Sequence, residues 1–80
     1  MKIQVLLFGI TTDILGTSSL EIEVPNTSTI AVFIKQFLNK YPQLENIDSY
    51  AIAVNEEYAS NETTLKENDV IAIIPPVSGG

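Results

Sequence analysis

The sequence predicts an α+β fold: a mixed β-sheet of about five strands with one long helix packed on one face and a projecting C-terminal Gly-Gly tail. Two short segments, around positions 5 and 22, alternate apolar with polar residues, as strands with one buried face do. A third segment has the spacing of an amphipathic helix, with the apolar residues Ile30, Phe33, Ile34, Phe37, Leu38 and Tyr41. The run Val70–Ile74 is continuously apolar and ends at Pro75, which is typical of a buried strand.

The N-terminal part of the chain contains the first two expected strands. The first spans residues 2–8 and is broken by Gly9. Residues 11–16 predict a single helical turn, which begins at a Thr or Asp cap and stops at a glycine. The second strand covers residues 20–24 and is closed by a turn at Pro25-Asn26. Its strict alternation indicates a half-buried strand at the periphery of the sheet.

The helix and three further strands follow. Thr29 is the expected helix cap, and Pro42 ends the helix because proline cannot continue it. We expect a third strand at residues 50–54, a short piece of strand around Tyr58 and a final strand at residues 70–74.

This order of elements, with one helix across a small mixed sheet, is the β-grasp arrangement found in ubiquitin. The final strand is apolar on both faces and therefore belongs in the middle of the sheet. A right-handed crossover makes it parallel to the first strand. The predicted core packs Phe33, Ile34, Phe37 and Leu38 of the helix against Val5, Leu7, Ile71 and Ile73 of the sheet.

The face of the sheet that the helix leaves open is expected to be an apolar patch beside the C-terminal tail. The two-residue period of a strand assigns Leu6, Phe8, Ala72 and Ile74 to this face. An apolar patch next to a projecting terminus indicates a surface that docks another protein.

The composition of the 80-residue chain excludes many functions. It has no histidine and no cysteine, so the commonest catalytic base, the commonest metal ligand and every thiolate site are missing. Ten acidic residues against four lysines, without arginine, give a net charge of −6 and argue against nucleic-acid binding. No membrane span or signal peptide is recognisable, so we expect a cytoplasmic protein. Because cysteine and histidine are missing, we also expect no bound metal, and we expect no bound cofactor.

The chain ends in Pro75-Pro76-Val77-Ser78-Gly79-Gly80. The two prolines cannot donate to a sheet and leave the chain stiff and extended. The two glycines lack a Cβ and can enter a channel that is too narrow for other residues. We therefore divide the chain into a folded domain, residues 1–76, and a flexible tail, residues 77–80, which carries the terminal carboxylate.

Several segments together resemble the small subunit of molybdopterin synthase, the MoaD-type sulfur carriers. They are Leu7-Phe8-Gly9, Thr29-Ile30, Ala53-Val54-Asn55-Glu56 and the terminal motif from Pro75 to Gly80. The resemblance implies that an ATP-dependent activating enzyme adenylates the Gly80 carboxylate and that a sulfur donor converts it to a thiocarboxylate. ATP is consumed by that enzyme and is not bound by this chain.

The resemblance also implies a partner and a product. The tail is inserted into the large, catalytic subunit of molybdopterin synthase, within a heterotetramer. Sulfur then passes to cyclic pyranopterin monophosphate and forms the dithiolene of molybdopterin, the ligand of the molybdenum cofactor. By position, Phe8, Tyr58 and Ile74 correspond to interface residues of the family, and the chain is a non-catalytic subunit.

The chain departs from the family pattern at two places. Thr12-Asp13 stands where Arg-Glu is common, so a partner ion pair through that arginine is not available. Glu67-Asn68-Asp69 stands where Gly-Asp is usual, which we interpret as a local difference in a turn.

Two other interpretations remain open on the residues. The chain could be another β-grasp sulfur carrier, of the thiamine pathway or of tRNA thiolation; those carriers share Gly-Gly but usually not the preceding Pro-Pro-Val-Ser. It could instead be a β-grasp interaction module whose tail is never activated. An enzyme proper is the least favoured interpretation, since the usual catalytic residue types are missing.

Overall fold

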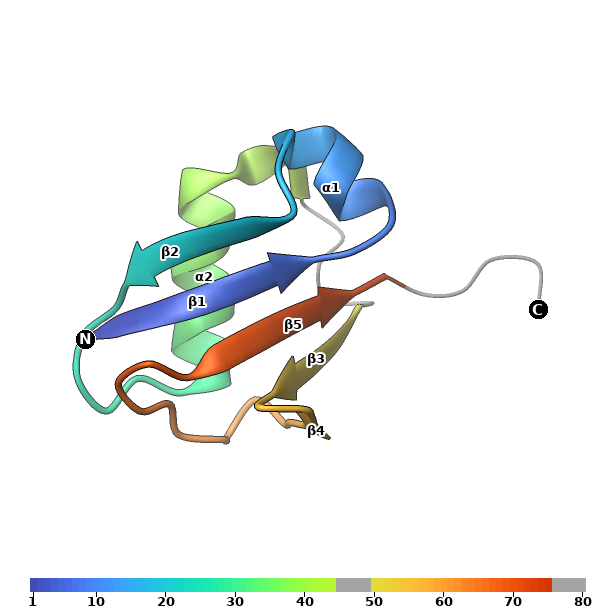
Figure 1. Ribbon diagram of the computed structural model, residues 1–80. Coiled ribbons are helices and arrows are strands. Elements are labelled where there is room, and N and C mark those ends of the chain that lie inside the picture. Colours follow the sequence, from blue (N-terminus) through green and yellow to red (C-terminus); the bar gives the residue numbers. More distant parts are fainter. Residues whose placement is uncertain (45–49, 76–80) are drawn as a thin grey trace.

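The sheet consists of five strands, which the computed structural model defines within its described residues, 1–44 and 50–75. They are β1 (Lys2–Leu7), β2 (Ser19–Glu23), β3 (Ala51–Val54), β4 (Glu57–Tyr58) and β5 (Val70–Ile74). Their spatial order is β2-β1-β5-β3-β4 (Figure 1). Each strand lies within one residue of the range that the sequence predicts.

Strand β5 lies in the middle of the sheet, as predicted. It pairs in parallel with β1, where Val5 lies opposite Ile71 and Leu7 opposite Ile73. On its other side it pairs antiparallel with β3, which places Ile52 opposite Ile73. Because both edges of β5 are hydrogen-bonded, the strand that leads to the C-terminal segment is firmly held.

The helices differ from the expectation of one long helix. The structure has two α-helices, α1 (Ile10–Leu15) and α2 (Ile30–Lys40), and a 3₁₀ turn, η1 (Pro42–Leu44). Helix α2 has only 11 residues. It ends there because Pro42 has no N–H and disfavours the helical region for Tyr41, whose φ is −129°.

One end of each α-helix has a local chemical cause. The Thr29 hydroxyl accepts a hydrogen bond from the N–H of Val32 at 3.4 Å, which confirms the predicted cap of α2. Helix α1 ends at Gly16, which has the left-handed φ of 71° and donates its N–H to the carbonyl of Thr12. The predicted helical turn is therefore present, but it begins at Ile10, one residue earlier than expected. The expected Thr or Asp cap is wrong: the N-cap position is Gly9, which has no side chain to cap the helix.

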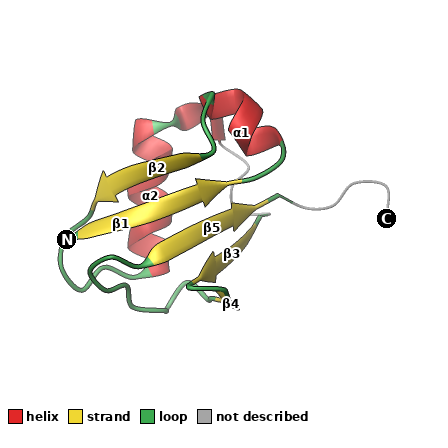
Figure 2. Cartoon of the chain, in the orientation of Figure 1, coloured by secondary structure: helices red, strands yellow, loops and turns green. Residues whose placement is uncertain are grey.

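The core lies between α2 and one face of the sheet. Figure 2 shows the helices in red and the strands in yellow. Phe33 and Phe37 are at most 1% exposed, and their rings stack with centroids 5.3 Å apart. The four predicted sheet residues, Val5, Leu7, Ile71 and Ile73, are all buried. Ile34 and Leu38 were predicted to lie in this core but are only half-buried, because they lie at its margin.

Neither α-helix in the described parts of the chain has the length and apolarity needed to cross a bilayer.

Candidate docking site on the open sheet face

The face of the sheet opposite α2 carries a row of residues that crosses four strands. The register places Leu6 of β1 beside Ala72 of β5, Ala72 beside Ala53 of β3, and Ala53 beside Tyr58 of β4. Directly paired residues project from the same face of a sheet. Tyr58, at 80% exposure, therefore extends the same row that Leu6 begins.

A second row runs parallel to the first, closer to the C-terminal end of β5. Ile74 lies opposite Ala51, and Phe8 follows directly after Leu7, the residue that pairs with Ile73. Phe8 is 46% exposed and Ile74 is half-buried. The predicted outward set of Leu6, Phe8, Ala72 and Ile74 is thus confirmed as one face, with Tyr58 beside it.

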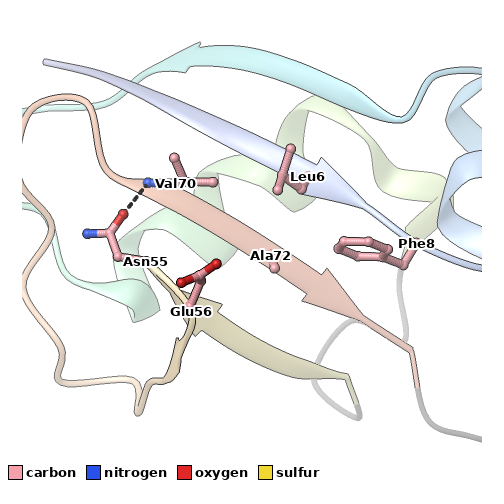
Figure 3. Close-up of a pocket in the computed structure, with 6 residues that line it drawn as sticks. All are labelled: Leu6, Phe8, Asn55, Glu56, Val70 and Ala72. Carbon is pink, nitrogen blue, oxygen red and sulfur yellow. Dashed lines mark hydrogen bonds between the residues drawn. The ribbon is translucent and has the colours of Figure 1, made fainter.

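This face is hollowed into a depression of about 460 Å³. It is lined by Leu6, Phe8, Asn55, Glu56, Val70 and Ala72, which Figure 3 draws as sticks. Apolar side chains form most of the lining, and the two polar residues come from the turn after β3. Ile74 and Tyr58 do not line this depression. Tyr58 lines a different one at the β3–β4 edge of the sheet, together with Ile30 and Ile34 of α2.

The polar rim of the depression was missed by the sequence analysis. Asn55 accepts a hydrogen bond from the N–H of Val70 through its side-chain oxygen at 3.0 Å, the dashed line in Figure 3. Its own N–H donates to the Val70 carbonyl at 2.8 Å. Asn55 and Glu56 both have positive φ, 51° and 74°, as a tight hairpin turn requires. Strand parity could have found Val70, but no local pattern gives the pairing of Asn55 with a residue 15 positions away.

Apart from Glu56, the charged residues of this face that pairing identifies lie on its β2 side. Cross-strand pairing places Glu21 beside Gln4 and Glu23 beside Lys2, in line with the outward residues of β1. Lys2 Nζ lies 4.0 Å from Glu21 Oε1, in an exposed pair that contributes little to stability. The open face is therefore apolar near the end of β5 and largely acidic toward β2, in a chain of net charge −6.

Both departures from the family pattern have a local explanation. The Thr12 hydroxyl donates to the carbonyl of Leu7 at 3.1 Å, so this position contacts its own chain rather than offering a cation to a partner. Asn68 has φ 69°, the left-handed conformation that a glycine adopts easily and that asparagine tolerates better than most residues. The interpretation of the Asn68 difference as a matter of turn conformation is confirmed.

The C-terminal motif is described only at its first residue. Pro75 follows β5 directly and is half-buried, and Pro76, Val77, Ser78, Gly79 and Gly80 lie outside the described residues. The predicted roles of the tail, and its boundary at residue 77, therefore remain predictions. Among residues 1–44 and 50–75, no group of three acidic side chains is placed to hold a metal ion.

Comparison with known proteins assigns the family. Residues 5–80 match the ThiS family. The chain belongs to the ThiS family. The match covers all five strands except the first residues of β1.

Curated relatives match over the full length. The molybdopterin synthase sulfur carrier subunit of Dictyostelium discoideum is 39% identical over 83 residues, covering 99% of this chain and 96% of the relative. The subunit of the same name from Arabidopsis thaliana is 36% identical over 81 residues, covering 100% of this chain and 84% of the relative. That of Mycobacterium tuberculosis is 34% identical, covering 100% and 99%. The resemblance to MoaD-type carriers is confirmed.

Solved structures agree with the fold. A putative molybdopterin converting factor subunit 1 from Pyrococcus furiosus has a TM-score of 0.87 at 27% identity, covering 96% of this chain and 99% of that one. The complex of subunits 1 and 2 of the molybdopterin-converting factor from Helicobacter pylori contains a match with a TM-score of 0.72 at 28% identity, covering 100% of both chains. SAMP1 from Haloferax volcanii has a TM-score of 0.89 at 22% identity, again with full coverage, and supports the β-grasp fold alone.

Proposed function

We propose that this chain is the sulfur carrier subunit of a cytoplasmic molybdopterin synthase and that the Gly80 carboxylate is the carrier group. The observation that carries this proposal is that curated relatives matching the whole chain bear the name molybdopterin synthase sulfur carrier subunit. Their shared name describes a carrier, so we assign catalysis to a partner. The fold gives physical support, since β5 leads from the middle of the sheet directly into Pro75.

The chemistry proposed for Gly80 uses no side chain of this chain. A carboxylate is a poor acyl donor, so an activating enzyme first joins it to the AMP portion of ATP and releases pyrophosphate. A sulfur donor then displaces AMP and leaves a thiocarboxylate. Its sulfur is a soft nucleophile that can attack an electrophilic carbon of the pterin substrate and displace an oxygen substituent from that carbon, without help from a cysteine or histidine of this chain. Water then cleaves the acyl–sulfur bond, which leaves sulfur on the pterin and restores the carboxylate.

A dithiolene contains two sulfur atoms, so two such transfers are needed for each product molecule. Each carrier leaves with a free carboxylate and must be activated again. In this scheme the folded domain supplies recognition, and the residues from Pro75 to Gly80 supply reach. A glycine pair at the end of the chain suits insertion into a narrow catalytic channel.

The partner proposed for the open sheet face is the large subunit of the synthase. The Helicobacter pylori complex pairs subunit 1, the match to this chain, with subunit 2. In this chain the exposed apolar residues Phe8 and Tyr58 lie on the same face as Ile74, next to the start of the C-terminal segment. An apolar centre with an acidic margin favours a partner surface that is apolar with basic residues around it. We assign the interface to Phe8, Tyr58 and Ile74.

The intact mass of the chain tests the function. After incubation with ATP, sulfide and a purified activating enzyme, replacement of one carboxyl oxygen by sulfur should raise the mass by about 16 Da, in the C-terminal peptide only. Omitting ATP is the control and should leave the mass unchanged. A mass that stays unchanged with all components, when a known carrier is converted in parallel, would favour the interaction module that is never activated. A carrier for thiamine or tRNA thiolation would gain the same mass but would give no dithiolene with the synthase large subunit.

A further inference from the structure

Gly9 occupies a backbone conformation that only glycine adopts readily. It lies between β1 and α1 with φ 58° and ψ −133°. A side chain in this region costs strain for any L-residue other than glycine. This conformation explains why the chain needs glycine at position 9. A second, independent observation links Gly9 to Pro75, at the start of the C-terminal segment.

The second observation is that the α-carbon of Gly9 packs against Pro75. A β-carbon built on Gly9 would lie 3.0 Å from Pro75 Cγ and 3.9 Å from Pro75 Cδ. Carbon atoms normally pack at about 3.5–4.0 Å, so the first of these contacts is too short to be tolerated without movement. The missing side chain of Gly9 therefore provides the space in which the Pro75 ring lies.

Neither side of this contact yields easily. On the Gly9 side, Thr11 is fully buried, its hydroxyl donates to the Phe8 carbonyl at 2.6 Å, and it accepts from the Phe8 N–H at 3.1 Å. On the other side, Ile74 is held in the ladder opposite Ala51, one residue before Pro75. A β-carbon at position 9 would therefore displace the ring of Pro75. Pro75 is the first residue after β5.

We propose that Gly9 is a positioning residue, which sets the direction in which the carrier terminus leaves the folded domain. It acts through Pro75, because the ring of one proline followed by another transmits its orientation to the residues after it. The proposal rests on the proposed function, since the direction matters only if the terminus must reach a catalytic centre in a partner. Docking of the folded domain uses the open sheet face and does not require this contact.

The test is a single-turnover transfer assay that starts from chains already loaded as thiocarboxylates, so that the activating enzyme is not needed. The large subunit is present in saturating amount, with cyclic pyranopterin monophosphate as the substrate. We expect Gly9→Ala to slow transfer about tenfold or more, because small errors of placement have large effects on rate. The affinity for the large subunit is measured in parallel and should change far less than the rate.

Gly16→Ala is the matched control. Gly16 also has positive φ, 71°, but a β-carbon there meets nothing within 4 Å. It therefore introduces left-handed strain beside the same helix without a contact to Pro75, and transfer should stay within about twofold of the wild type. Equal slowing by Gly9→Ala and Gly16→Ala would overturn the proposal, because strain alone would then explain both.

A rescue experiment separates the contact from the strain. Pro75→Ala removes the Cγ atom and should itself slow transfer by loss of the contact. In that background, Gly9→Ala should slow transfer by less than about twofold, because nothing remains to be pushed. An undiminished effect in the Pro75→Ala background would overturn the proposal. If Gly9→Ala does not fold, Pro75→Ala decides alone: slowed transfer with the fold intact supports the proposal, and wild-type transfer overturns it.

Failure of the inference can be distinguished from failure of the proposed function. If the wild-type thiocarboxylate transfers no sulfur, the function itself is wrong. If the wild type transfers sulfur and Gly9→Ala equals it, only the role of Gly9 is wrong. A nuclear Overhauser effect between the α-protons of Gly9 and the Pro75 ring tests the contact without any partner, and its absence would overturn the inference whatever the function.

Discussion

The side-chain amide of Asn55 donates a hydrogen bond to the carboxylate of Asp69 at 2.9 Å, and so joins the β3–β4 turn to the residue before β5. Asp69 is only 8% exposed, and its second oxygen accepts from the N–H of Lys66 at 2.8 Å. One carboxylate thus holds two turns together, and one of these turns forms part of the rim of the depression on the open sheet face.

We predict that Asp69→Ala lowers the free energy of unfolding by about 1–3 kcal/mol, because the amide of Asn55 and the N–H of Lys66 lose their acceptor. Urea denaturation measures the change. Glu62→Ala is the control, since Glu62 is exposed, and it should stay within about 0.5 kcal/mol of the wild type. Equal stability of the two variants would contradict the role given to the carboxylate.

Phe37→Ala should lower the free energy of unfolding by about 3–5 kcal/mol, a large share of the stability of a small domain. The ring is 1% exposed, stacks on Phe33 and lies 5.1 Å from the Tyr41 ring centroid. Val32→Ala, on the exposed side of the same helix, should have little effect. An unchanged unfolding midpoint for Phe37→Ala would remove α2 from the core and contradict the fold.

Phe8→Asp and Ile74→Asp should each weaken binding to the synthase large subunit by about tenfold or more, because each would bury an unpaired charge in the interface. Isothermal titration with folded variants measures this. Val32→Asp is the matched control: Val32 is 45% exposed, almost the same as Phe8, but it lies on α2, behind the sheet. Unchanged affinity for both sheet variants would show that the open face is not the interface.

The sequence predicted the parts of this molecule that depend on periodicity. Strand parity placed Leu6 and Ala72 on the open face, and helical spacing placed Phe33 and Phe37 in the core. It did not predict the pairing of Asn55 with Val70, or the packing of Pro75 on Gly9. These contacts join residues far apart in the chain, and they depend on how the strands are brought together rather than on any local pattern.

The bounds of α2 were predicted to within one residue, because Thr29 caps the helix and Pro42 cannot continue it. What the apolar spacing did not predict is how deeply each side chain is buried. The same spacing could not rank Ile34 against Phe33, although one lies at the margin of the core and the other at its centre. Burial at the edge of a small core depends on the partners that surround each side chain.

The width of the tail is predicted to limit transfer. Gly79→Val should keep normal stability, because position 79 lies beyond the last strand, and should abolish sulfur transfer by blocking the partner's channel. Gly79→Ala is the graded control and should retain part of the rate. A chain extended by one residue after Gly80 should fold normally but accept no sulfur. Normal transfer by Gly79→Val would show that the channel does not require a glycine there.

Deletion of Gly80 tests the central claim most directly. The measurement is dithiolene formation from cyclic pyranopterin monophosphate by the large subunit, with the activating enzyme, ATP and sulfide present. We predict that the deleted chain unfolds at the same urea concentration as the wild type and still binds the large subunit, yet forms no product, because the carboxylate that carries sulfur is misplaced. Product formation at the wild-type rate by the deleted chain would contradict the sulfur-carrier account and would leave a β-grasp interaction module in its place.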